Sequence, residues 1–196
     1  MEKVYNTVLE VEEEKFKRRD GSEGVAVHFH VVDAHVMHNV TDKNGNELRF
    51  RNFAGIGGPM NHEGDRNFIW VWDNPEIADI LRGEGFNVKE YEYDDGSIAF
   101  QLKIRVKYRG TWSDPKIYLD SDTAPRVEMP EECLGDLDDM FFEHVDFTFT
   151  KYNYKAMGRT GVSAYLEDAL IYKRAARTRA SRYETVHYGN FVDVEE

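Results

Sequence analysis

Cysteine is nearly absent from this sequence, and Cys133 is the only one. A single cysteine excludes an internal disulfide framework and a zinc site built on cysteines. Long apolar runs are also missing, because no stretch approaches the roughly 18 uninterrupted apolar residues that a membrane-spanning helix needs. The first 21 residues lack the apolar core and the small-residue cleavage site of a signal peptide. We therefore expect an intracellular protein without a membrane segment.

Motifs typical of catalysis are missing as well. The sequence has no G-x-x-x-x-G-K-[ST] phosphate loop, no G-x-S-x-G elbow and no catalytic cysteine context. Nucleases use grouped carboxylates to hold magnesium. The candidates for such a group are Glu131, Glu132, Asp136, Asp138 and Asp139. No partner base accompanies them, so we interpret the segment as a solvated acidic loop and predict that the protein is not an enzyme.

Four histidines follow one another closely in the sequence HFHVVDAHVMH. The pair His28 and His30 is a plausible first half of a metal site. Asp33 could join it, but no nearby residues complete an obvious ligand set. We interpret these histidines as surface or half-buried side chains, and we predict neither a metal nor a cofactor.

The formal net charge of -12 argues at first against a polyanionic partner. Its distribution changes that interpretation. Residues 120–146 contain ten acidic residues and one basic one, whereas residues 147–189 contain eight basic and three acidic ones. Segregated charge allows a basic surface on an acidic protein.

The pattern of the chain predicts many strands and one helix. At 196 residues the chain is most simply one domain with extensions. Asn74 can cap a helix that begins at Pro75 and ends near Gly83. Residues 1–24 read as a charged strand or arm that ends in a turn. The predicted strands lie at 25–37, 48–53, 68–72, 87–93, 98–108, 116–119, 145–154 and 162–172. Such an order favours a small, highly curved β-barrel, with a flat sandwich as the alternative.

Residues 101–107, QLKIRVK, alternate more clearly than any other segment. Their apolar side chains face one side, while Lys103, Arg105 and Lys107 face the other. Successive cations on a strand face are about 7 Å apart, close to the phosphate spacing of an extended single strand. An ordinary solvated strand face is the alternative interpretation.

Aromatic side chains accompany basic ones in two other segments. In FTFTKYNYK (147–155), Tyr152 and Tyr154 face away from the phenylalanines and could stack on bases. The segment 49–72 adds arginines and rings, and its two copies of Arg-Asn-Phe flank a glycine-containing loop. Some of these rings must be core, and we expect at least one of Trp70 and Trp72 to be buried.

An ordered set of motifs extends this picture: RFRNFAGIGGPMNHEGDRNF (49–68), NPEIADILRGEG (74–85), FNVK (86–89) and YNYKAMGRTGVSAYL (152–166). This set resembles the bacteriophage single-stranded-DNA-binding proteins with an OB fold, over roughly residues 47–172. The resemblance implies a mainly β, five-stranded Greek-key barrel with an inserted helix and terminal extensions. It also implies a non-catalytic protein that coats single-stranded DNA during replication, recombination or repair. The expected division is an N-terminal extension or additional strands at 1–45, the OB-fold barrel at 46–173 and a flexible basic, then acidic tail at 174–196.

The loop between the Arg-Asn-Phe copies would then border the oligonucleotide groove. The alternative is that Asn52 and Asn67 pair structurally while Phe53 and Phe68 belong to the core. The basic and aromatic residues of the exposed strand faces are the candidate DNA contacts. They are Arg49, Arg51, Phe53, Arg66, Phe68, Trp70, Lys89, Lys103, Arg105, Lys107, Tyr152, Tyr154 and Arg159.

The chain ends in FVDVEE, an acidic segment after a basic run. By similarity to other single-strand-binding proteins, residues 191–196 could compete with DNA for the groove and dock on replication proteins. A non-catalytic protein–protein adaptor that uses the same β-surface is the alternative function.

Overall fold

The computed structural model describes residues 6–93, 95–111, 113–121, 124–156 and 158–173, and the backbone of 187–188 and 191–192. Its elements are β1 (Val8–Lys17), β2 (Glu23–Val36), β3 (Val40–Thr41), β4 (Glu47–Leu48), β5 (Arg51–Asn52), β6 (Arg66–Trp72), α1 (Pro75–Gly83), β7 (Lys89–Glu92), β8 (Ile98–Val106), β9 (Lys116–Ser121), β10 (Ala124–Glu128), the 3-10 helix η1 (Glu131–Asp139), β11 (Phe142–Ala156), β12 (Arg159–Lys173), β13 (His187–Tyr188) and β14 (Phe191–Val192). The mainly β class expected from the sequence is confirmed. In these residues, no helix has the length and apolar character needed to cross a bilayer.

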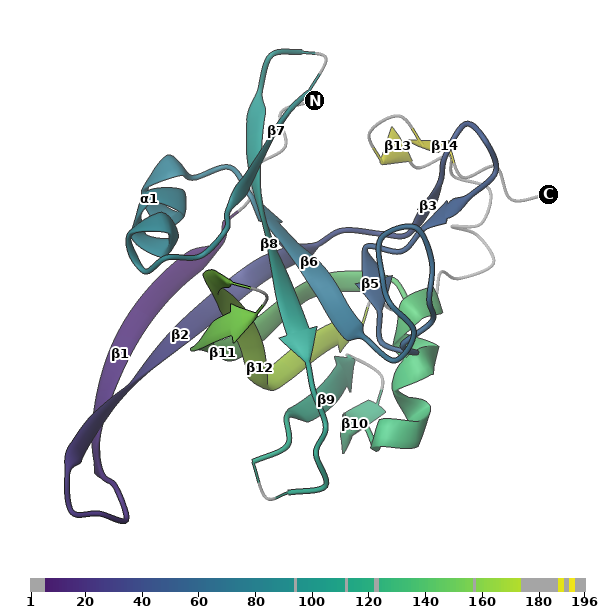
Figure 1. Ribbon diagram of the computed structural model, residues 1–196. Coiled ribbons are helices and arrows are strands. Elements are labelled where there is room, and N and C mark those ends of the chain that lie inside the picture. Colours follow the sequence, from purple (N-terminus) through teal and green to yellow (C-terminus); the bar gives the residue numbers. More distant parts are fainter. Residues whose placement is uncertain are drawn as a thin grey trace.

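Five strands form a closed ring in the order β2, β6, β8, β12, β11 and back to β2 (Figure 1). Four of the five junctions are antiparallel. The fifth is parallel and joins β12 to β8 through Ala164 with Ile104 and Tyr165 with Arg105. The other strands extend this ring: β1 pairs with β2, β7 with β8, and β9 with β12.

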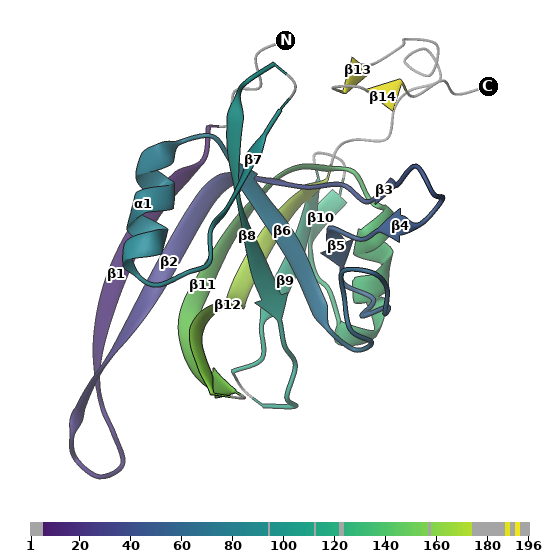
Figure 2. The ribbon, with the colours of Figure 1, turned by 45° about the horizontal axis from the view of Figure 1, so that its top comes forward.

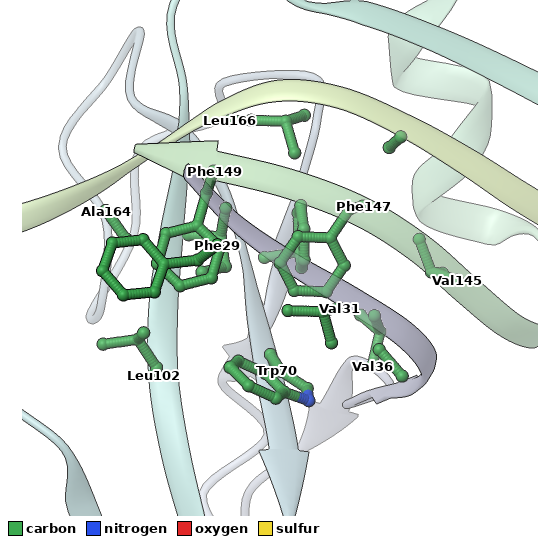
Figure 3. Close-up of a cluster of buried hydrophobic side chains, with 14 of the residues drawn as sticks. Phe29, Val31, Val36, Trp70, Leu102, Val145, Phe147, Phe149, Ala164 and Leu166 are labelled. Atoms are coloured by element: carbon green, nitrogen blue, oxygen red, sulfur yellow. The ribbon is translucent and has the colours of Figure 1, made fainter. Parts of the chain in front are cut away.

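Aromatic side chains fill the interior of the ring (Figure 3). Alternation along each strand sends one set of residues inward, as the period of two requires. Trp70 and Trp72 are fully buried, with ring centroids 4.1 Å apart. The rings of Phe29 and Phe149 stack at 4.9 Å, and Phe86 meets both edge-on. The expectation that at least one of the two tryptophans is buried is confirmed for both.

Helix α1 begins and ends where the sequence predicts. The side-chain oxygen of Asn74 accepts a hydrogen bond of 2.9 Å from the amide of Glu76, which caps the helix. Its apolar face, with Ile77, Ala78 and Leu81, is buried in the core.

The segment 1–45, for which the sequence predicts an extension or additional strands, contains β2, and β2 is one of the five strands of the ring. The expectation about the acidic segment needs correction. The acidic segment is not a solvated loop throughout, because it forms β10 and η1, in which Asp138 is buried. This error arises from contacts between distant parts of the chain, because Asp138 accepts hydrogen bonds from the backbone of Phe53 and Ala54. The expected tail at 174–196, including its acidic end at 191–196, lies outside the described residues apart from the backbone of 187–188 and 191–192.

Candidate nucleic-acid interface

The two Arg-Asn-Phe copies lie on adjacent strands. Strand β5 pairs with β6, so that Asn52 is opposite Asn67. Asn52 donates to the carbonyls of Ile56 (3.0 Å) and Asp65 (2.8 Å), and its side-chain oxygen accepts from the amide of Ile56 (2.9 Å). Asn67 donates to the side-chain oxygen of Asn61 at 2.9 Å. The asparagines therefore hold both ends of the loop between β5 and β6 in a fixed shape.

Arg51 is a core residue, so the expectation that it lies on an exposed strand face is wrong. Its side chain is 3% exposed, and Nη1 donates to the carbonyl of Met140 at 2.7 Å. Its guanidinium also lies over the ring of Phe142, 4.4 Å from the centroid. Burial lowers the pKa of Arg51 to about 10, while the charge of Asp138 acts in the opposite direction. These contacts join β5 to η1 and β11, so we remove Arg51 from the candidate interface.

Three of the expected stacking rings are also buried. Phe53 and Phe68 stack on each other with centroids 5.8 Å apart, and both are at most 2% exposed. Trp70 meets the ring of Phe147 edge-on at 5.6 Å inside the ring of strands (Figure 3). The apolar rings of β6 thus point into the core, because removing their apolar surface from water stabilises the fold. The expectation that Phe53, Phe68 and Trp70 lie on exposed strand faces is therefore wrong.

The outward face of β8 carries the cations that the alternation predicts. Lys103 and Arg105 point away from the core residues Leu102, Ile104 and Val106, which are buried. Lys89 lies on β7, opposite Gln101 and on the same face. The pKa of Lys103 is lowered, first by burial and then by the positive charges of Arg105 and Lys89, with Asp65 in opposition. Lys89, Lys103 and Arg105 are thus close enough for their positive charges to repel one another. A bound anion would reduce this repulsion.

Tyrosines continue this face across the parallel junction. Tyr165 is the register partner of Arg105, so both side chains lie on the same side of the sheet. The ring of Tyr152 meets that of Tyr165 edge-on, with centroids 5.6 Å apart. Tyr154 lies across Gly161, where a Cβ atom would come within 2.5 Å of the tyrosine oxygen. Tyr152 and Tyr154 are 52% and 42% exposed, which leaves their rings accessible.

We call this surface the outer strip. It consists of Lys89, Lys103, Arg105, Tyr152, Tyr154 and Tyr165. Tyr165 was missed in the sequence, although its place between Ala164 and Leu166 in the segment S-A-Y-L gives it the outward position. Its pairing with Arg105 depends on the closure of the ring.

The loop between β5 and β6 borders the outer strip. Lys103 Nζ donates to the carbonyl of Met60 (3.4 Å) and to Oδ1 of Asn61 (3.3 Å). The side-chain Nδ2 of Asn61 in turn donates to the backbone carbonyl of Arg49 at 3.0 Å. Arg49 is half-buried and its guanidinium contacts Glu47 at 2.6 Å. Arg49 therefore lies near the strip, but its charge is already paired.

The remaining candidates are Arg66, Lys107 and Arg159. Arg66 is opposite Val106, with the inward set of residues, and its guanidinium pairs with Glu131 on η1. Lys107 is exposed beyond the end of β8. The side chain of Arg159 lies outside the described residues.

The histidines form a second polar cluster, on strand β2. His28 Nδ1 lies 2.7 Å from Glu167 and Nε2 lies 3.4 Å from Glu14. His30 Nε2 lies 3.1 Å from Glu12. The hydrogen bond with Glu167 raises the pKa of His28 above its ordinary value, against the opposing effect of burial. Both histidines are half-buried, as predicted, and they connect β1 to the ring.

A comparison with protein-family models supports the resemblance that the sequence motifs indicate. Residues 35–193, most of the chain, match a family model described as "Putative phage ssDNA-binding domain". A similar solved structure is the single-stranded DNA-binding protein from bacteriophage Enc34, in a C-terminal truncation. It has a TM-score of 0.44 and 12% identity, with 91% of this chain and 95% of that chain covered. A comparison with curated protein sequences gave no significant match. The resemblance seen in the sequence is confirmed: this chain belongs to the family of phage single-stranded-DNA-binding domains.

Proposed function

We propose that this protein binds single-stranded DNA with little sequence preference, on the outer strip of an OB-fold barrel. The observation that carries the proposal is the pairing of Arg105, which follows Lys103 on the outward face of β8, with Tyr165 across the junction of β8 and β12. A closed five-strand ring supports the OB fold. In OB folds, strands 2 and 3 and the loops after strands 1 and 4 form the oligonucleotide site. Here these are β6, β8, the segment 37–65 and the connection between β11 and β12.

The side chains of the outer strip are suited to binding single-stranded DNA of any sequence. Lysine and arginine attract phosphates whatever the bases are, and each exposed tyrosine offers a flat face on which a base can stack. Stacking is tolerant of sequence because all four bases have such a face. The protein would act without catalysis in phage DNA replication, recombination or repair. The acidic end at 191–196 would compete for the strip and dock on replication proteins.

The first test is fluorescence anisotropy of a labelled oligo-dT at low and moderate salt, with duplex DNA as competitor. We expect tight binding that weakens as salt increases, since counterions are released from the phosphates. Duplex DNA should not displace the oligonucleotide, because its bases are stacked and cannot reach the tyrosines. Absence of binding at low salt would refute the proposal and would favour the protein–protein adaptor.

Replacing Tyr165 by Ala is expected to weaken oligo-dT binding without changing its dependence on salt. A base stacked on an aromatic side chain contributes about 1–3 kcal/mol, which corresponds to about 5- to 150-fold in affinity. The same assay measures it, and Phe141→Ala is the control because Phe141 is 55% exposed and lies outside the strip. Equal affinities of both variants and the unmodified protein would exclude Tyr165 as a stacking platform.

A further inference from the structure

The β1–β2 hairpin reaches well beyond the ring of strands (Figure 2; also Figure 1). Residues from Val8 to Lys17 pair with β2 in one continuous register, from Val32 to Glu23, without a shift. In the part of the chain that the structure describes, no strand pairs with the other edge of β1. That edge therefore presents a row of backbone donors and acceptors to the surroundings.

Strand β1 has few of the features that usually prevent pairing at an exposed edge. Proteins protect such edges with short strands, prolines, bulges or charges that repel a second strand. Here the strand is ten residues long and contains no proline. Val8, Val11 and Phe16 are between 43% and 51% exposed. The remaining protection would have to come from charge, so the arrangement of charge on β1 decides what the edge can accept.

The charges of β1 are divided between its two halves. Glu10, Glu12, Glu13 and Glu14 precede Lys15 and Lys17, and Arg18 and Arg19 follow at the turn. A parallel copy of this strand would place like charges opposite one another. An antiparallel copy places the acidic half against the basic half, which favours pairing. The strand is therefore complementary to itself in one direction.

We propose that β1 pairs antiparallel with β1 of a second copy of this chain, so that two sheets join in a symmetric dimer. The two-fold axis of such a pair is perpendicular to the sheet and passes close to Glu14. That register places Glu13 opposite Lys15 of the second copy, and Glu10 opposite Arg18. On the face of β1 that carries Glu12 and Glu14, both carboxylates already have a neighbour in their own chain, because His30 Nε2 lies 3.1 Å from Glu12 and His28 Nε2 lies 3.4 Å from Glu14.

Sedimentation equilibrium of the full chain tests the dimer. The unmodified protein should show a monomer–dimer equilibrium. Glu13→Lys alone and Lys15→Glu alone should each weaken it roughly 10- to 100-fold, since each converts two attractive cross-strand pairs into repulsive ones. The double variant Glu13→Lys/Lys15→Glu should restore the dimer. Lys43→Glu makes the same charge change as Lys15→Glu, but in an exposed turn, and it should leave the dimer unchanged.

A mixing experiment makes the test independent of the folding of any one variant. Glu13→Lys chains and Lys15→Glu chains should form mixed dimers with each other, although neither dimerises well alone. Oligo-dT affinity per chain should stay unchanged, because the β1 edge lies outside the outer strip. A protein that remains monomeric up to millimolar concentration, or charge variants that fail to pair when mixed, would overturn the proposal.

Discussion

The triple variant Lys89→Ala/Lys103→Ala/Arg105→Ala is expected to lose about 100-fold in oligo-dT affinity near 0.1 M salt. Each phosphate contact with a single strand contributes about 0.7 to the slope of log K against log[salt]. Three contacts therefore contribute about 2 to this slope. At about 0.1 M salt, where log[salt] is about -1, losing them lowers log K by about 2, which is the loss of about 100-fold in affinity. Anisotropy titrations over a range of salt concentrations measure both quantities. The slope is the sharper readout, because it reports the number of phosphates contacted.

A matched control separates this effect from a general change in net charge. Lys43→Ala/Lys116→Ala/Arg126→Ala also removes two lysines and one arginine, but all three side chains are exposed and none of them belongs to the outer strip. Its salt slope should equal that of the unmodified protein. If both triple variants reduce the slope equally, DNA binding is not localised on the outward face of β8.

Replacing Asp138 by Ala is expected to destabilise the fold by about 3–5 kcal/mol. The carboxylate accepts hydrogen bonds from the amides of Phe53 (2.8 Å) and Ala54 (3.0 Å), in a position that is 6% exposed. Its removal leaves two donors without an acceptor, and each unsatisfied buried group costs about 1–3 kcal/mol. The buried guanidinium of Arg51 also loses a favourable charge. Urea denaturation measures the change in the free energy of unfolding.

Asp136→Ala on the same 3-10 helix is the control for this prediction. Asp136 is exposed, so its replacement should change the free energy of unfolding by no more than about 0.5 kcal/mol. A similar loss for both variants would show that negative charge on η1 stabilises the fold generally. Equal stability of Asp138→Ala and the unmodified protein would contradict the role of Asp138 as an anchor for the end of β5.

The sequence predicted those parts of the structure that depend on local patterns. Helix α1 follows from Asn74 and Pro75, which specify the first turn of a helix by their own conformations. The outward face of β8 follows from strict alternation, because each cation is flanked by residues that must be buried. Neither prediction required knowledge of a distant contact.

Predictions failed where long-range contacts decide which side of a strand is buried. Strand β5 has only two residues, so its pattern cannot show that Arg51 lies inside. The partners that hold Arg51 are Leu137, Met140 and Phe142, far along the chain. Tyr165 was missed for the related reason that it meets Arg105 only because the ring closes. Local sequence specifies alternation, whereas the assignment of faces comes from tertiary packing.

The junctions of the ring differ greatly in extent. Strands β11 and β12 pair along almost their whole lengths, and β6 pairs with β8 from end to end. By contrast, β2 meets β6 at His35 and Val36, and β12 meets β8 at Ala164 and Tyr165. The barrel is thus two half-shells joined along two narrow seams. The cations of the outer strip belong to one half-shell and its tyrosines to the other. A DNA strand that contacts both would therefore hold the two half-shells together at the short junction of β8 and β12.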